Sequence, residues 1–121
     1  MLDHLTLTVS DFARSRAFYK IALAPLGYDE QMSFEGMIGF GEKQKPSFWI
    51  KQGPLPQSPM HLAFKARSRA MVDAFYAAAL AAGGRDDGPP GVRAHYHPSY
   101  YAAFVIDPQG HSIEAVCHLG I

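Results

Sequence analysis

The feature of this sequence that most restricts its fold is one pattern that occurs in both halves of the chain. His4-Leu5-Thr6-Leu7 stands near the start of the first half, and His61-Leu62-Ala63-Phe64 stands near the start of the second. Each begins with a histidine, and the residues after it fit the two-residue period of a half-buried β-strand. A helical segment and then short strands follow in both halves. The period of about half the chain predicts two similar modules.

In the first half, the pattern predicts one strand, one helix and three further strands. Ser10 or Asp11 offers a side-chain oxygen as the N-cap of the helix. Pro25 and Gly27 follow the helix and mark its end. The predicted helix covers residues 12–23, and the predicted strands cover residues 2–9, 28–34, 37–40 and 47–51.

The second half repeats this order after the segment 53–59, which holds three prolines in seven residues. Ser68 is the expected helix N-cap, and Gly83-Gly84 ends the alanine-rich helix. The predicted helix covers residues 71–82, the predicted strands cover 60–66, 100–106 and 112–117, and segment 85–91 and Asp107-Pro108-Gln109-Gly110 are predicted as turns.

The expected architecture is an α+β fold of two tandem βαβββ modules, about 1–53 and 59–121, within a single domain. The two modules together are expected to form an open half-barrel cleft. The length of 121 residues and the apolar fraction of 48% are sufficient for one compact core.

Charge and cysteine content exclude several classes of function. Eleven basic residues balance eleven acidic ones, so no basic stripe predicts binding to nucleic acid or to an anionic membrane. No apolar run is long enough to span a bilayer, and no signal peptide is visible. Cys117 is the single cysteine, so no intrachain disulfide can form. The default expectation is therefore a cytoplasmic protein.

Three side chains form the candidate metal site. His4 and His61 occupy equivalent strand positions, so they can converge across a cleft if the modules are related by a pseudo-twofold axis. Glu114 lies on the face of the last strand opposite Ile113 and Ala115, and a carboxylate there is costly to bury without a metal or an ion pair. Two imidazoles and one carboxylate leave open positions on Zn²⁺, Fe²⁺, Mn²⁺ or Ni²⁺, as catalytic sites require.

The segments "HLTLTVSD", "HLAFKA" and "DPQGHSIEAV" resemble those of the vicinal oxygen chelate superfamily, which includes glyoxalase I, fosfomycin-resistance thiol transferases, extradiol dioxygenases and bleomycin-binding proteins. The resemblance covers nearly the whole chain. It implies that His4, His61 and Glu114 bind one divalent metal ion, and that the metal chelates two neighbouring oxygens of a substrate. It also implies a homodimer in which His4 of one chain meets His61 and Glu114 of its partner.

Two positions depart from particular branches of that superfamily. The segment "PSFWIKQ" aligns with "HSIEAVC", so Trp49 stands where glyoxalase I has a fourth ligand, a glutamate. Phe104 stands where the thiol transferases have a cleft tyrosine. The resemblance therefore implies a three-ligand site and does not select one reaction among isomerisation, ring-cleaving dioxygenation and addition of a thiol or water.

Several further side chains are expected to line the substrate pocket. Thr6 shares a strand face with His4, and Trp49 lies on the face opposite Phe48, so both are expected in the cleft wall with Phe104. Segment 93–101 holds two histidines and three tyrosines. His95 and Tyr96 are expected at the pocket, and His97 and Tyr100 are the candidate acid/base residues. The same loop could instead pack at a dimer interface, or supply His97 as an extra ligand.

The main alternative function is a metal-free binding protein of the bleomycin-resistance kind. In that case His4 and His61 are ordinary strand-end histidines, and the side chains of Trp49, Phe104 and Tyr100 stack on a bound aromatic or cationic compound. Three other residues are expected to lie outside the metal site. His111 is expected to form hydrogen bonds in its turn, His118 lies too far along the strand to share the ion, and Cys117 is expected to be buried under a helix.

Overall fold

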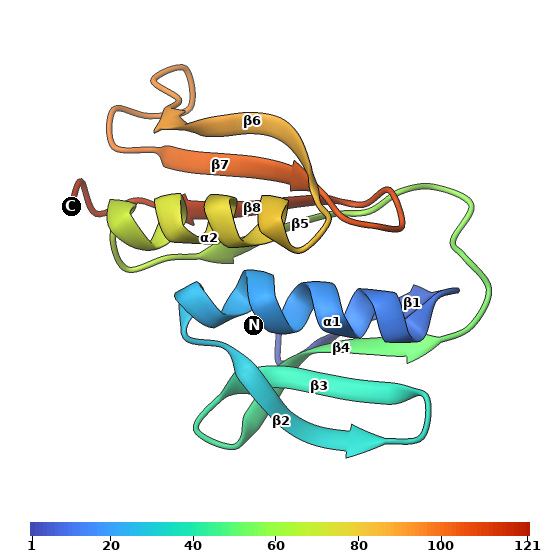
Figure 1. Cartoon of the computed structure of the whole chain (residues 1–121). Helices are drawn as coiled ribbons and strands as arrows, with labels where there is room; N and C mark the ends of the chain where they lie inside the picture. Colours follow the sequence, from blue (N-terminus) through green and yellow to red (C-terminus); the bar gives the residue numbers. More distant parts are fainter.

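The computed structural model of the chain describes residues 1–121 and contains two modules with the same order of elements (Figure 1). The first module contains β1 (Leu5–Val9), α1 (Phe12–Leu23), the short 3-10 helix η1 (Ala24–Leu26), β2 (Asp29–Phe34), β3 (Met37–Glu42) and β4 (Lys45–Gln52). The second contains β5 (His61–Lys65), α2 (Arg69–Ala81), β6 (Arg85–Val92), β7 (Tyr101–Ile106) and β8 (Ser112–Cys117).

Each module holds one four-stranded mixed sheet. The strand orders are β1-β4-β3-β2 and β5-β8-β7-β6, so the first strand of each module pairs in parallel with the last. The other neighbours are antiparallel. Two modules of this kind with open sheets confirm the expected α+β class.

Both helices begin at side-chain caps. The Asp11 carboxylate accepts a hydrogen bond from the backbone N–H of Arg14 at 3.2 Å, and the Ser68 hydroxyl accepts one from Met71 at 3.2 Å. Each cap satisfies a backbone donor that the first helical turn leaves unpaired. The structure thus selects Asp11 over Ser10 and confirms Ser68. Neither helix is long and apolar enough to cross a membrane.

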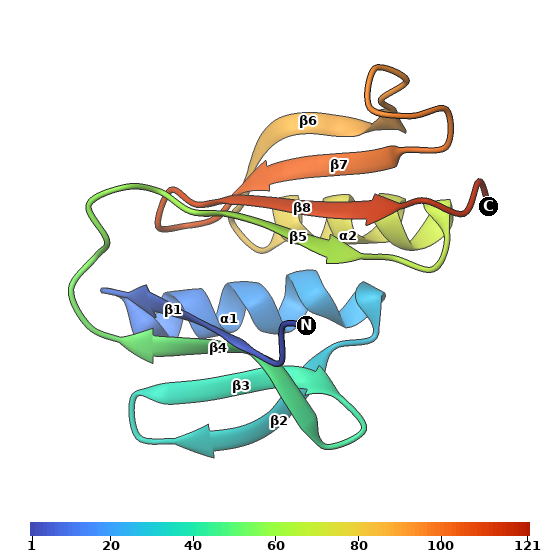
Figure 2. The same ribbon diagram turned by 180° about the vertical axis from the view of Figure 1, so that it is seen from behind.

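The two helices pack against each other and cover the same side of both sheets (Figures 1 and 2). The apolar core lies between the helices and the strands, where the side chains of Leu7, Ile50, Val72 and Ile113 are fully buried. Cys117 is also fully buried in this core, as the strand parity predicted. The opposite faces of the sheets carry no helix, so they are available to a ligand or to another chain.

Polar and aromatic contacts fix the two modules against each other. The buried Tyr19 hydroxyl in α1 donates a hydrogen bond to Asp107 in the turn between β7 and β8. The Gln109 side-chain oxygen accepts a hydrogen bond from the backbone N–H of Ser10 at 2.7 Å. Between the sheets, the ring of Phe64 contacts Phe48 edge-on, with a centroid separation of 5.3 Å.

Strand β6 differs from the sequence-based expectation, which placed a turn over residues 85–91. It is an edge strand that pairs with β7 through two irregular steps, between Asp86 and Gly88 and between Gly88 and Gly91. An edge strand tolerates Pro89 and Pro90 because backbone donors on its outer side need no partner strand. The turn-forming composition therefore reflects an irregular edge, which local propensity alone does not distinguish from a loop.

The strand registers show that the modules are equivalent residue by residue. Leu5 pairs with Phe48 in β1–β4, and Leu62 pairs with Ile113 in β5–β8. Because Leu5 and Leu62 occupy equivalent positions, the residues directly before them, His4 and His61, are equivalent as well. The same equivalence relates the pair Thr6–Trp49 to the pair Ala63–Glu114. Trp49 therefore occupies the position of Glu114 in the other module, as the alignment of the two sequence segments predicted.

The substitution Tyr19→Phe tests the contact between the modules. It leaves one oxygen of the buried Asp107 carboxylate without its donor, so the free energy of unfolding should fall by about 1–3 kcal/mol. Urea denaturation monitored by circular dichroism measures this change. The matched control is Tyr76→Phe, because the Tyr76 hydroxyl donates to Asp86 at the exposed surface. A loss as large in the control as in Tyr19→Phe would contradict the structural role.

Candidate functional site

His61 and Glu114 meet on the face of the second sheet that is not covered by the helices. His61 begins β5 and Glu114 lies in the neighbouring strand β8, with His61 Nε2 at 2.9 Å from Glu114 Oε1. The Glu114 side chain is only 3% exposed, whereas that of His61 is 52% exposed. The pair therefore combines a buried carboxylate with an imidazole that solvent can reach.

Two hydroxyl groups orient this pair. Ser112 Oγ lies 2.9 Å from His61 Nδ1, and the Tyr100 hydroxyl donates a hydrogen bond to the second oxygen of Glu114. One imidazole nitrogen can thus face the carboxylate or an ion while the other is held by Ser112, which is how outer contacts orient histidine ligands. Ser112 is the strand partner of His61 in the parallel pair. Ser112 is not among the predicted site residues, and this register is the signal that identifies it.

Tyr100 remains protonated over the physiological range. Burial, together with the hydrogen bond to the Glu114 carboxylate, raises the pKa of Tyr100 to about 12. A phenol with this pKa donates a hydrogen bond at neutral pH and does not act as a general base. Of the two acid/base roles expected for Tyr100, the structure therefore favours the donor.

Phe104 forms an apolar wall beside the pair. It is the strand partner of Glu114 in the β7–β8 pairing, and its ring stacks with the His61 imidazole at a centroid separation of 6.2 Å. The ring shields the carboxylate from water, which strengthens the electrostatic interactions of Glu114. Phe104 therefore lies beside the His61–Glu114 pair, and its contact with a substrate stays a prediction.

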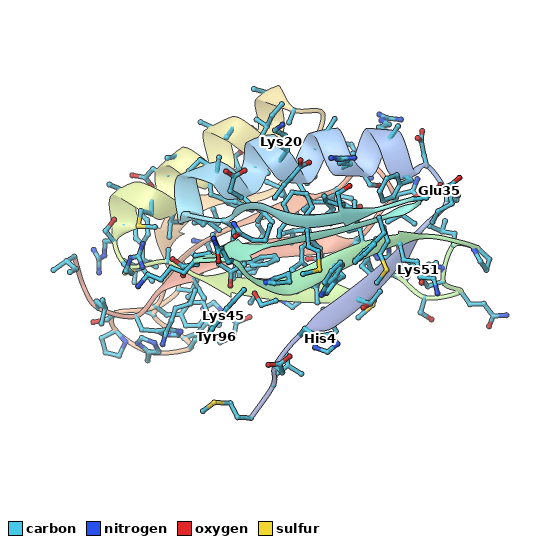
Figure 3. The ribbon with its side chains drawn as sticks, turned by 90° about the horizontal axis from the view of Figure 1, so that it is seen from below. His4, Lys20, Glu35, Lys45, Lys51 and Tyr96 are labelled. Atoms are coloured by element: carbon cyan, nitrogen blue, oxygen red, sulfur yellow. The ribbon has the colours of Figure 1, made fainter.

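His4 lies apart from the pair, on the first module. Its Nδ1 atom lies 2.7 Å from Asp3 Oδ2, and the His4 side chain is 55% exposed. Figure 3 shows His4 beside the strands, on the side away from the helices. Within the single chain, no three His, Cys, Asp or Glu side chains are grouped to hold a metal ion. The fold thus brings His61 and Glu114 together and leaves His4 on a separate surface.

A cavity of about 950 Å³ adjoins His4 and does not include His61 or Glu114. Its walls include Asp3, His4, Thr6, Tyr28, Lys45, Trp49 and Arg67. Two of the residues expected in a substrate pocket, Thr6 and Trp49, therefore line the cavity of the first module. Phe104 lines the site of the second module instead.

Trp49 provides a flat apolar surface in this cavity. Its indole stacks with the ring of Phe34 at a centroid separation of 6.2 Å and an interplanar angle of 19°. The indole lies over Gly39 in β3, where a Cβ atom would come within 3.0 Å of two ring carbons. The glycine therefore allows the indole to lie against the sheet, and the exposed Phe34 extends the aromatic surface.

The loop after β6 is attached to the end of β8. His97 Nε2 lies 2.8 Å from His118 Nδ1, and His97 Nδ1 accepts a hydrogen bond from the backbone N–H of Ser99. The His95 ring contacts that of Tyr96 at a tilt of 42°, and Tyr96 is 60% exposed. The loop thus brings Tyr100 to Glu114, whereas His97 contacts His118 and Tyr100, and His95 and Tyr96 lie at the surface.

His111 has the structural role expected for it. Its Nδ1 atom accepts a hydrogen bond from the backbone N–H of Met60 at 2.9 Å, and the ring is almost fully buried. The ring ties the β7–β8 turn to the residue before β5. His111 therefore supports the strand on which His61 lies and does not contribute to the site itself.

The pair His61–Glu114 has the donor types and spacing of two metal ligands. Bonds of about 2.0–2.2 Å from nitrogen and oxygen ligands place two donor atoms about 3 Å apart around one ion. The 2.9 Å separation between His61 Nε2 and Glu114 Oε1 agrees with this value. Ser112 and Tyr100 leave these two atoms free to face an ion. The residues present therefore fit a divalent metal, which would need further ligands from outside this pair.

Comparisons with known proteins place the chain in a family. Residues 1–115 match the model of the Glyoxalase/Bleomycin resistance protein/Dioxygenase superfamily. A glyoxalase/bleomycin resistance protein from Albidiferax ferrireducens T118 is 29% identical, with a TM-score of 0.82 over 97% of this chain and 98% of that protein. No curated protein matches the sequence.

Two further solved structures share the fold at lower identity. A glyoxalase-related enzyme from Fulvimarina pelagi is 20% identical, with a TM-score of 0.75 over 97% of this chain and 87% of that protein. A glyoxalase/bleomycin resistance protein/dioxygenase family enzyme from Burkholderia phytofirmans PsJN is 18% identical, with a TM-score of 0.74 over 97% and 98%. From its sequence and its paired βαβββ modules, this chain belongs to the glyoxalase/bleomycin resistance protein/dioxygenase superfamily.

Proposed function

We propose that this protein is a metal-dependent enzyme that acts on a small oxygen-bearing substrate. The observation that carries the proposal is the contact between His61 and the buried Glu114. The Ser112 hydroxyl contacts the other nitrogen of His61, and the Tyr100 hydroxyl donates to the other oxygen of Glu114. A buried carboxylate with an imidazole at ligand spacing is suited to a divalent ion such as Zn²⁺, Fe²⁺, Mn²⁺ or Ni²⁺. Such an ion supplies Lewis-acid activation of two neighbouring substrate oxygens when it is bound.

The third ligand in this proposal is His4 of a second copy of the chain. His4 is equivalent to His61 in its module, is solvent-accessible, and is not grouped with His61 and Glu114 within one chain. A dimer that places the uncovered face of one chain's first sheet against that of the other chain's second sheet would join the halves of the site. In that arrangement Thr6 and Trp49 would face Phe104 across the cleft.

The remaining residues of the site have roles that follow from their contacts. Tyr100 donates a hydrogen bond to the Glu114 carboxylate and fixes the orientation of the carboxylate. Phe104 excludes water from that carboxylate, and Trp49 with Phe34 offers a surface on which a planar substrate can stack. His97 lies in the loop, where its imidazole contacts that of His118. Any acid/base role of His97 would therefore be exerted from the loop. The buried, unpaired thiol of Cys117 suits a cytoplasmic protein.

A second candidate function is metal-free binding of an aromatic compound, as in a bleomycin-resistance-type protein. The observation that favours it is the stacked pair Trp49–Phe34, which stands in the first module where the second has a carboxylate. In that case the His61–Glu114 contact is an internal ion pair or hydrogen bond. The two functions differ in their need for metal.

Metal analysis separates the two functions. Protein purified without chelator should contain one divalent ion per chain. His61→Ala removes a ligand nitrogen and Glu114→Gln removes the negative charge of the ligand carboxylate, so each should weaken the metal affinity at least tenfold. Elemental analysis by mass spectrometry and competition with a chromophoric chelator measure both quantities. His118→Ala is the matched control and should retain the metal. Metal-free wild-type protein that binds aromatic compounds would support the second function.

A mixing experiment tests whether the site is shared between chains. His4→Ala and Glu114→Ala variants should each bind no metal alone, because every shared site lacks one ligand. After they are unfolded and refolded together, the mixed dimers should regain part of the wild-type metal content, since one site in each contains all three ligands. Native mass spectrometry detects the metal in the mixed dimer. Mixed dimers without metal would refute the shared site.

A further inference from the structure

Arg93 is held against Tyr100 by the backbone of its loop. It directly follows β6, and its backbone N–H donates to the carbonyl of Tyr100 at 2.7 Å. Tyr100 is the residue whose hydroxyl reaches Glu114. The two residues thus close the base of the loop together, and both lie beside the candidate site.

The guanidinium group of Arg93 lies over Phe104. Its Cζ atom is 5.3 Å from the centre of the Phe104 ring, and the same ring stacks with His61. Because β7 lies between β6 and β8 in the sheet, Arg93 reaches Phe104 from the β6 side and His61 reaches it from the β5–β8 side. Arginine stacks on aromatic rings in this way while keeping its edge free for hydrogen bonds.

Two glycines make room for this group. A Cβ atom at Gly88 would lie 3.2 Å from Arg93 Nη2, and one at Gly91 would lie 3.1 Å from Arg93 Nη1. The guanidinium donates hydrogen bonds to the carbonyls of Pro89 at 2.7 Å and of Gly91 at 2.8 Å. The irregular edge strand therefore forms a recess that fixes the position of the guanidinium.

Arg93 has no carboxylate in contact. Two other arginines do, since Arg16 pairs with Glu30 at 2.8 Å and Arg67 lies 3.8 Å from Glu42. The two carbonyl contacts use two of the five guanidinium N–H groups, so three remain for another acceptor. A half-buried cation with fixed geometry and free donors is suited to a carboxylate of the ligand.

We infer that Arg93 is the anion-binding residue of the substrate site, and that the substrate is a small planar acid. This inference rests on the proposed function, which places the chelated oxygens of the substrate at His61 and Glu114. The imidazole and the guanidinium lie over the Phe104 ring from opposite sides, so a substrate that crosses the edge of this ring can reach both. Its carboxylate meets Arg93, and its two neighbouring oxygens lie at the other end. Aromatic acids with two adjacent hydroxyl groups have this shape.

A purely structural role for Arg93 predicts a different result. If the guanidinium serves only to hold the carbonyls of β6, its loss should disturb the loop and weaken all ligands equally. If it binds the substrate anion, its loss should remove only the preference for a negatively charged ligand. A pair of probes that differ by one carboxylate separates the two roles.

Catechol and 3,4-dihydroxybenzoate are suitable probes for zinc-loaded protein. Calorimetric titration should show that 3,4-dihydroxybenzoate binds about tenfold more tightly than catechol, because a charge-assisted hydrogen bond is added. Arg93→Gln should abolish this preference and leave the catechol affinity unchanged. Arg93→Lys should retain part of it, because the charge remains but the planar fork is lost. Arg85→Gln, at the other end of β6, is the control and should keep the full preference.

The outcomes distinguish the inference from the proposed function. A preference that is absent, or that persists in Arg93→Gln, overturns the role of Arg93, while zinc-dependent binding of catechol still supports the metal site. If neither probe binds in a zinc-dependent way, the proposed function fails. Benzoate and benzamide then test Arg93 in metal-free protein by nuclear magnetic resonance titration. A preference for benzoate that Arg93→Gln removes supports the anion-binding role, and equal or no binding of the two overturns it.

Discussion

Each module depends on the parallel pairing of its first and last strands. This pair lies at one edge of each sheet, and its register fixes which side chains of the two strands share a face. A shift of one residue would turn Glu114 into the core and Ile113 to the uncovered face. The contacts of His61 with Ser112 and Glu114 also require this register. The site is therefore a direct consequence of the strand pairing that builds the fold.

The two modules use the same framework for different surfaces. At equivalent positions, the second module has the buried Glu114 carboxylate and the first has the Trp49 indole over Gly39. The carboxylate is tolerated because an imidazole and a phenol satisfy it, which removes most of the penalty for burying a charge. The indole is tolerated because a glycine provides space under the ring. One half thus provides polar chemistry, and the other provides a surface for stacking.

The helices explain why the two surfaces lie apart in one chain. They occupy the same side of both sheets and hold the modules together through buried apolar contacts and the Tyr19–Asp107 hydrogen bond. That packing commits one face of each sheet to the core and leaves the other uncovered. The proposed dimer and the proposed anion subsite at Arg93 both use these uncovered faces. The side of the strands that faces the helices therefore forms the core, and the opposite side of the same strands carries the residues of the proposed site.

The sequence by itself determined the two modules, the helix boundaries at Phe12–Leu23, the final strand Ser112–Cys117 and the equivalence of Trp49 with Glu114. These depend on periodicity, caps and internal repetition, which are local. Only the tertiary structure decided that segment 85–92 is an edge strand, that Ser112 and Tyr100 hold the His61–Glu114 pair, and that Arg93 stacks on Phe104. Those contacts join residues from different strands and a loop, and no local pattern specifies how such segments meet.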